Sequence, residues 1–247
     1  MTIVEFNNEF DIQYDSIATK GAPGLDLYEK SVYLTRAQLE LVKRHYHPLG
    51  NKYQEGFEHT EKRRVDLKEL IKSYKTFSPI SSINGISTDS KFYNIPNELM
   101  FIIQEEAIIS STDPCLNGKI LEIIPKTHDE YNRQRKSPFK RPNENKAWRM
   151  DFSKQNGNKN VEIITPYDLQ QYSCRYLKYP SPIILTDLSA GDFLGEGLTI
   201  EGLTQPQTSE LDRELHPEIV ALAVELADTD YKDGTLNSRI LRNSKQE

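Results

Sequence analysis

Few residues of this sequence have the types and spacing that catalysis or metal binding requires. Two of the five histidines, His45 and His47, are two residues apart, so on a helix they point to different sides and do not share a metal ion. The only cysteines, Cys115 and Cys174, form neither a disulfide framework nor a zinc motif. His128 could act as a general base beside Asp129 and Glu130, but no nucleophile motif lies near it. We therefore expect no enzyme, no metal site and no cofactor, with a hydrolase centred on His128 as the enzymatic alternative.

The distribution of charge along the sequence says more about function than the catalytic residue types do. The segment from Lys126 to Arg149 has eight basic and three acidic residues, a net charge of +5. The segment from Asp187 to Asp233 has twelve acidic and two basic residues, a net charge of −10. Such blocks are either two solvated faces or a basic loop that meets the acidic surface of an adjacent copy, head to tail. The candidate interface residues are Arg133, Arg135, Lys136, Lys140, Arg141, Glu210, Asp212 and Glu214.

Nucleic acid is another possible partner of the basic segment. The string RQRKSPFKRP interleaves cations with an aromatic residue, a pattern that can contact phosphates. Phe139 lies between two prolines, so it could equally be a small anchor that holds a surface loop against the protein. We expect these cations to engage mainly protein, with non-specific contact to double-stranded DNA as a secondary role.

Helices are expected at the start of the chain. Phe6, Phe10 and Tyr14 recur every four residues, which predicts an apolar helical stripe. Leu27, Leu34, Ala37 and Leu41 form a second stripe, which should face a helical core. The pair Thr35 and Gln38 has the spacing of a capping box and predicts that a new helix starts there and ends near Tyr46. A shorter helix is predicted over residues 66–74.

Strands are expected in the middle of the chain. Trp148, Met150 and Phe152 alternate with polar residues, as do Tyr172, Cys174 and Tyr176. Residues 120–124 and 161–164 are further candidates, and residues 99–109 are interpreted as strand rather than helix. Pro180 and Pro182 favour an edge position for the last strand, where a missing N–H is tolerated.

The chain should end in a polar connection, a helix and a tail. The connection covers residues 187–206, and the helix begins near Pro217, followed by a polar tail after Asp233. The predicted fold is therefore α+β, with an N-terminal helical segment, a central antiparallel β-sheet and a C-terminal helix. We expect a single domain over 1–247, with a helical part at 1–75, a mainly β part at 76–186, and the acidic linker, closing helix and tail at 187–247.

Composition indicates a chain that completes its burial against partners. Only 36% of the residues are hydrophobic, and the net charge is −6. This balance gives a thin core and excludes a generally basic nucleic-acid coat. No apolar run approaches the ~18 residues of a membrane span, so no membrane association is expected.

Several strings, in their order along the chain, resemble one family. The chain is similar to ring proteins from the head–tail connector of crAss-like, short-tailed bacteriophages, most strongly at residues 5–75, 119–186 and 215–228. The strings that carry the resemblance are EFDIQYDSIATKGAPGLDLYEKSVYLTRAQLELVKRHYH, NKYQEGFEHTEKRRVDLKELI, IPKTHDEYNRQRKSPFKRPNENKAWRMDF, VEIITP, YSCRYLKYPSPIIL and HPEIVALAVELA.

The resemblance implies a structural role in the virion. Such proteins resemble tail adaptors that stack beneath the portal as a homo-oligomeric ring of twelve copies, extend the DNA channel and join capsid to tail. The implied partners are the portal protein and other connector rings, and the implied place of assembly is the cytoplasm of the bacterial host. The resemblance transfers no catalytic residues. The alternatives are another virion component, such as a tail hub or minor capsid protein, and a DNA-binding accessory factor.

Overall fold

The protein consists of two compact units, one of which is built from both ends of the chain. The computed structural model describes residues 1–17, 24–47, 57–80, 85–155, 157–189 and 197–231. Unit 1 combines residues 1–70 with residues 180–247, and unit 2 is the uninterrupted stretch 71–179. The architecture is α+β, as predicted, whereas the prediction of one ring domain over 1–247 stays a prediction.

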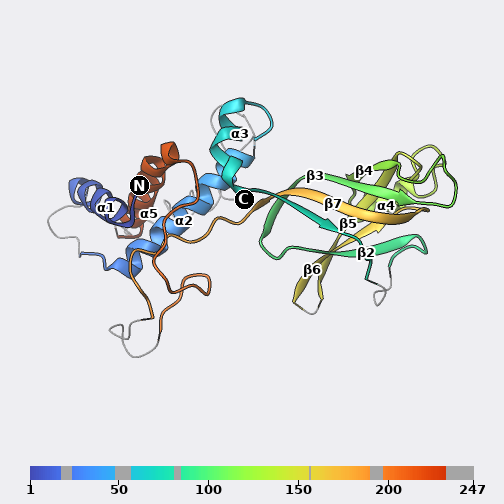
Figure 1. The fold of residues 1–247 in the computed structure, drawn as a ribbon. Helices are drawn as coiled ribbons and strands as arrows, with labels where there is room; N and C mark the ends of the chain where they lie inside the picture. Colours follow the sequence, from blue (N-terminus) through green and yellow to red (C-terminus); the bar gives the residue numbers. More distant parts are fainter. Residues whose placement is uncertain (18–23, 48–56, 81–84, 156, 190–196, 232–247) are drawn as a thin grey trace. The chain divides into compact units, whose positions relative to one another are not determined.

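Unit 1 is helical and draws its helices from both ends of the chain (Figure 1). Phe6, Phe10 and Tyr14 are buried, as the four-residue spacing predicted. The Phe6 ring lies 5.0 Å from the His216 ring, so the first helix packs against the last. The elements are α1 (Ile3–Ile17), α2 (Leu27–Tyr46), α3 (Glu61–Leu67), the 3-10 helices η2 (Lys68–Leu70) and η3 (Arg213–Leu215), and α5 (His216–Tyr231).

Helix α2 is continuous, so the predicted helix start at Thr35 is wrong. The capping box is formed instead by Asp26 and Glu29, each side chain accepting a hydrogen bond from the backbone of the other. Leu34, Ala37 and Leu41 are buried, as predicted. Leu27, in the first turn of the helix, is 36% exposed and does not belong to that core.

The polar residues of α2 bind an extended chain segment. Ser31, Thr35 and Gln38 are spaced four and three apart and therefore share one helix face. The Ser31 hydroxyl accepts from the N–H of Leu185 at 3.0 Å, and the Thr35 hydroxyl accepts from the N–H of Ile183 at 3.1 Å. The Gln38 amide donates to the carbonyl of Ser181 at 2.7 Å. These hydrogen bonds satisfy the backbone of a buried segment that belongs to no sheet.

The helix predicted over residues 66–74 is wrong in its second half. α3 ends at Leu67, the 3-10 turn η2 follows, and strand β1 (Ile71–Thr76) begins directly after it. Thr60 is the N-cap of α3 and accepts from the N–H of Arg63. Leu67 and Leu70 are both buried in unit 1.

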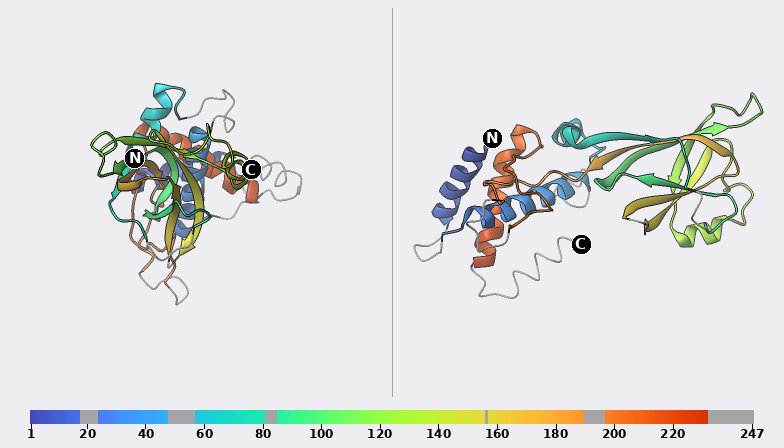
Figure 2. Two further views of the ribbon diagram at one scale, coloured as in Figure 1. Left: turned by 90° about the vertical axis from the view of Figure 1, so that its right-hand side faces the viewer. Right: turned by 60° about the horizontal axis from the view of Figure 1, so that its bottom comes forward.

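Unit 2 is a curled, seven-stranded sheet with the strand order β1-β7-β3-β4-β5-β6-β2 (Figures 1 and 2). The strands predicted at 99–109, 120–124, 148–152, 161–164 and 172–176 are confirmed. Besides β1, the strands are β2 (Ser90–Ile95), β3 (Leu99–Ser110), β4 (Ile120–Pro125), β5 (Lys146–Gln155), β6 (Asn158–Ile164) and β7 (Asp168–Lys178).

Two features of the sheet differ from the prediction. β4 and β5 are parallel, while every other neighbouring pair is antiparallel. β7 lies between β1 and β3, so the edge position inferred from Pro180 and Pro182 is wrong. Both prolines follow the strand, which ends at Lys178, so neither interrupts its hydrogen bonds.

Two apolar clusters hold unit 2 together. The larger one includes Tyr93, Ala107, Ile163 and Tyr172, and the Tyr93 and Tyr172 rings stack at 5.3 Å. The smaller one consists of Tyr131, Trp148, Met150 and Ile164. None of the helices in the described ranges is long and apolar enough to span a membrane.

Candidate interaction surface

The basic segment is the connection between the two parallel strands. Parallel neighbours cannot be joined by a tight hairpin and need a crossover, here residues 126–145 with the helix α4 (His128–Gln134). Thr127 and Glu130 form a capping box that starts α4. Tyr131 packs edge-on against Trp148 with ring centroids 6.0 Å apart, which fixes α4 to β5. The sheet therefore holds the segment in place.

The five predicted cations are all exposed on α4 and the loop that follows it. The Arg135 guanidinium lies 5.9 Å from the centre of the Tyr131 ring. Arg141 donates from Nε to the carbonyl of Arg135 at 2.8 Å. Within the described part of the chain, none of the five forms an ion pair, whereas Lys126 pairs with Glu130 at 3.8 Å. The structure thus brings together a set of available cations.

Phe139 is not the loop anchor that the sequence allowed. Its side chain is 94% exposed, the largest value among the exposed large hydrophobic residues that the structure describes. Tyr131 fills the anchoring role instead, because it is buried against Trp148. Phe139 therefore projects from the same loop as the cations.

The three predicted carboxylates lie in unit 1, around the start of η3. Glu210 accepts a hydrogen bond from the N–H of Ser181 at 3.2 Å. Asp212 caps η3 by accepting from the N–H of Glu214, and this hydrogen bond holds the pKa of Asp212 below its usual value. Asp212 also lies 3.5 Å from the ammonium of Lys68. Of the three, Glu214 is the exposed one, while Glu210 and Asp212 have structural roles in unit 1.

Unit 2 contains a buried polar network that no sequence pattern predicted. Arg149 donates to Glu105 at 2.6 Å, and the Tyr172 hydroxyl donates to the other oxygen of the same carboxylate, also at 2.6 Å. Burial raises the pKa of Glu105, although the Arg149 charge opposes this, and burial raises the pKa of Tyr172. Glu105 alternates with Ala107 and Ile109 on the inward face of β3, where sequence reasoning expects an apolar residue and not a carboxylate.

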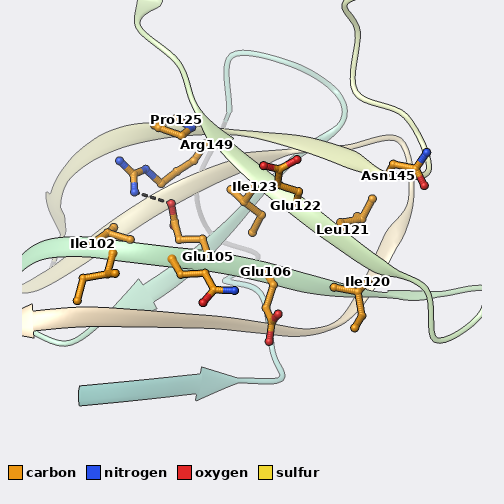
Figure 3. Close-up of a pocket in the computed structure, with 12 residues that line it drawn as sticks. Ile102, Glu105, Glu106, Ile120, Leu121, Glu122, Ile123, Pro125, Asn145 and Arg149 are labelled. Carbon is orange, nitrogen blue, oxygen red and sulfur yellow. Dashed lines mark hydrogen bonds and ion pairs between the residues drawn. The ribbon is translucent and has the colours of Figure 1, made fainter. Parts of the chain in front are cut away.

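This network borders a hollow of about 470 Å³ where β3 and β4 separate (Figure 3). The two strands pair only over residues 106–108 and 120–122, and beyond this point Arg149 reaches from β5 towards Glu105. Ile102, Ile123 and Pro125 line the hollow together with this ion pair. The arrangement ties β3 to β5 across the opening.

Around this network, the residues that the structure describes form no catalytic arrangement. Cys174 belongs to the same apolar cluster as Tyr172, but burial raises the pKa of its thiol to about 11, which keeps it protonated. His128, the candidate general base, lies exposed at the start of α4. Among the described residues, no group of three or more potential metal ligands comes together.

Unit 1 also contains a buried histidine. His45 of α2 lies with its Nδ1 3.2 Å from a carboxylate oxygen of Asp66 in α3, without hydrogen-bond geometry, and its Nε2 3.9 Å from Glu218 in α5. Burial, helped by the charges of Arg63, Lys62 and Arg44, lowers the pKa of His45 to about 4. Burial also raises the pKa of Asp66. In the folded protein, burial therefore favours the neutral imidazole of His45, and it shifts the Asp66 carboxyl towards its neutral form.

Comparison with known proteins agrees with a structural role. The sequence model of the phage tail ring protein 3/4 family matches residues 1–239. Ring protein 4/5 of Bacteroides phage crAss001 is 37% identical over 240 residues, covering 94% of this chain and 94% of the relative. Ring protein 3 of the same phage is 33% identical over 228 residues, covering 92% of this chain and 95% of the relative. The chain therefore belongs to the phage tail ring protein 3/4 family of crAss-like phages, and it is a structural component of the virion.

Proposed function

We propose that this chain forms a closed ring of the head–tail connector, below the portal, where it extends the DNA channel and joins capsid to tail. The observation that carries the proposal is the match to two ring proteins of one phage over more than nine tenths of the chain. We further propose that the ring has twelve copies, contacts the portal and other connector rings, and is assembled in the host cytoplasm.

Imaging of intact virions tests this proposal most directly. A connector ring requires density for this chain around the channel axis, and an assembled ring has a mass that is an integer multiple of 28.5 kDa. Single copies scattered over the capsid would contradict the ring. Density at the tail tip would instead favour a tail hub.

The charge distribution supports head-to-tail contact between copies. The cations lie on α4 and the α4–β5 loop of unit 2, while the acidic segment belongs to unit 1, so the two oppositely charged segments of each copy are in different units. Two different surfaces on each subunit are what a heterologous ring interface needs. Exposed ion pairs contribute only ~0–1 kcal/mol each, so their effect is on alignment and assembly rate more than on affinity.

Charge reversal tests this contact. Changing Arg135, Lys136 and Arg141 to Glu should impair particle assembly, and reversing the acidic partner to Lys at Glu214 should partly restore it. A matched control reverses Lys72, Lys75 and Arg175, three exposed cations on β1 and β7 of the same unit. Normal assembly of the first variant, with altered DNA retention or ejection, would show that the loop faces the channel.

DNA contact is the second candidate role, and the five available cations are the observation that favours it. Each phosphate contact steepens the logarithmic salt dependence of binding by about 0.9, so five engaged cations would give a slope of about −4.5. A connector must let the genome slide, and so strong a clamp on the channel wall would hinder it. We therefore expect a shallow slope for purified protein on duplex DNA.

A further inference from the structure

We propose that Phe139 is the apolar anchor by which one copy of this chain docks onto the acidic surface of the next copy. This inference rests on the proposed ring function. It assigns to the α4–β5 loop a hydrophobic contact at its centre, with Arg135, Lys136, Lys140 and Arg141 around it. The occupant of this loop is thus a second copy of the chain.

Exposure alone does not carry this assignment, because scattered apolar side chains are normal on protein surfaces. Phe139 differs in being nearly fully exposed, while Phe6, Phe10 and Phe92 are buried. It also stands within nine residues, 133–141, that contain five cations and no carboxylate. Phenylalanine and arginine are both residue types that are enriched at protein interfaces, and arginine is frequent among the residues that contribute most to binding.

The loop that carries Phe139 is braced before it meets a partner. Ser137 donates from its backbone N–H to the carbonyl of Gln134 at 2.9 Å, and Lys140 does so to Ser137 at 3.3 Å. Arg141 closes the loop through its hydrogen bond to the carbonyl of Arg135. A loop already held in one conformation loses less entropy on binding, which favours a docking role.

A protein surface suits this loop better than DNA does. A duplex offers phosphates to the cations, but an aromatic side chain can enter it only as a wedge between base pairs, which kinks the helix. A kink in the duplex opposes the sliding that a connector channel requires. An acidic protein surface with an apolar spot satisfies the cations and the phenyl ring together.

The chain itself has such a surface in unit 1. Within the acidic segment, Leu203 is 45% exposed next to the tight turn at Glu201 and Gly202, and the Glu201 carboxylate is exposed. Glu214, which is also exposed, lies further along the same segment. The N–H and C=O groups of Ile200 and Leu203 hydrogen-bond to each other at 3.0 and 2.9 Å, so this turn is well defined. Its charge is opposite to that of the Phe139 loop, which selects a second copy as the partner.

Site-specific photo-crosslinking in assembled virions tests the assignment. A benzophenone amino acid replaces Phe139, and isotope-labelled and unlabelled copies are mixed so that links between copies can be recognised by mass. We expect links from position 139 to residues 197–231 of another copy. The same probe at Phe77, which is 64% exposed in the same unit, should give no such link.

Assembly of simple variants gives an independent result. Phe139→Ala should lower incorporation into particles about tenfold, Phe139→Leu should keep most of it, and Phe77→Ala should leave it unchanged. Links from position 139 to DNA, to another protein or within the same copy would overturn the proposal, as would normal incorporation of Phe139→Ala. If Phe139→Ala is incorporated normally and imaging shows a ring, only the docking role of Phe139 is rejected. If imaging shows no ring at all, the proposed function itself is rejected.

Discussion

The buried His45 predicts that the helical unit loses stability as the pH falls. Above pH 6.5 the imidazole is neutral in both the folded and the unfolded chain. Between that value and about pH 4, the unfolded chain binds a proton that the folded chain excludes, because burial lowers the pKa of His45 to about 4. Proton uptake therefore favours unfolding in this window. At about 1.4 kcal/mol for each tenfold change in proton concentration, going from pH 7 to about pH 5 should lower the free energy of unfolding by about 2 kcal/mol.

The measurement needs a probe for each unit. Far-ultraviolet circular dichroism follows mainly α1, α2 and α5 of unit 1, while fluorescence of Trp148, the only tryptophan, follows unit 2. Urea unfolding at several pH values then gives the pH dependence of unit 1. Asp66, whose pKa is raised by burial, binds a proton more readily in the folded protein and therefore opposes the effect of His45 on stability as the pH falls. The comparison is therefore made with His45→Gln, which cannot gain a positive charge. His128→Gln, at an exposed histidine of unit 2, is the matched control.

The difference between the two pH profiles decides the matter. We expect the wild-type protein to lose about 2 kcal/mol more than His45→Gln between pH 7 and about pH 5. Parallel profiles would refute the reasoning. A wild-type protein that becomes relatively more stable in acid would show that the Asp66 carboxylate, 3.2 Å away, outweighs burial and stabilises the imidazolium.

Three further predictions about the stability of unit 1 can be tested by urea unfolding. Leu34→Ala should lower the free energy of unfolding by about 2–5 kcal/mol because Leu34 is fully buried. Leu27→Ala, at the exposed end of the stripe, should lower it clearly less, and similar losses for both variants would mean that the stripe is misassigned. Thr35→Val keeps the side-chain shape but removes the acceptor for the N–H of Ile183, so we expect a loss of about 1–3 kcal/mol, and an unchanged midpoint would argue against that hydrogen bond. Glu201→Asn should raise stability by about 0.5–1 kcal/mol because Glu201 has a φ of 52°, which Asn tolerates better; a loss would reveal a stabilising role for the Glu201 side chain.

The sequence predicted the elements of this fold better than their ends. The alternation of Trp148, Met150 and Phe152 located a strand because it reflects local burial on one sheet face. Thr35 and Gln38 misled, since the same residue types that cap a helix also bind a passing backbone, and residues 181–185 are far away in the sequence. Pro180 misled for a related reason, because strand order depends on which distant strand pairs alongside.

The candidate site was only partly predictable. The charge pattern predicted a basic segment with five cations, and the structure adds that these residues lie on α4 and the loop after it, in the crossover between parallel strands. The exposure of Phe139 could not be read from its sequence neighbours, because it depends on Tyr131 taking the anchoring place beside Trp148. The pair Glu105 and Arg149 joins residues 44 positions apart, so no local pattern announces it.

The division of the chain into a continuous unit and a unit built from both ends sets an order for folding during translation. Every strand of unit 2 has been synthesised once the ribosome has passed residue 179, so its sheet can form while the rest is being made. The helical unit must wait for α5, because Phe6 of α1 packs against His216. A chain that stops early therefore presents a finished sheet and an open helical core. Such a truncated product also lacks the acidic segment, which under the proposed docking is the part that receives the loop of a neighbouring copy.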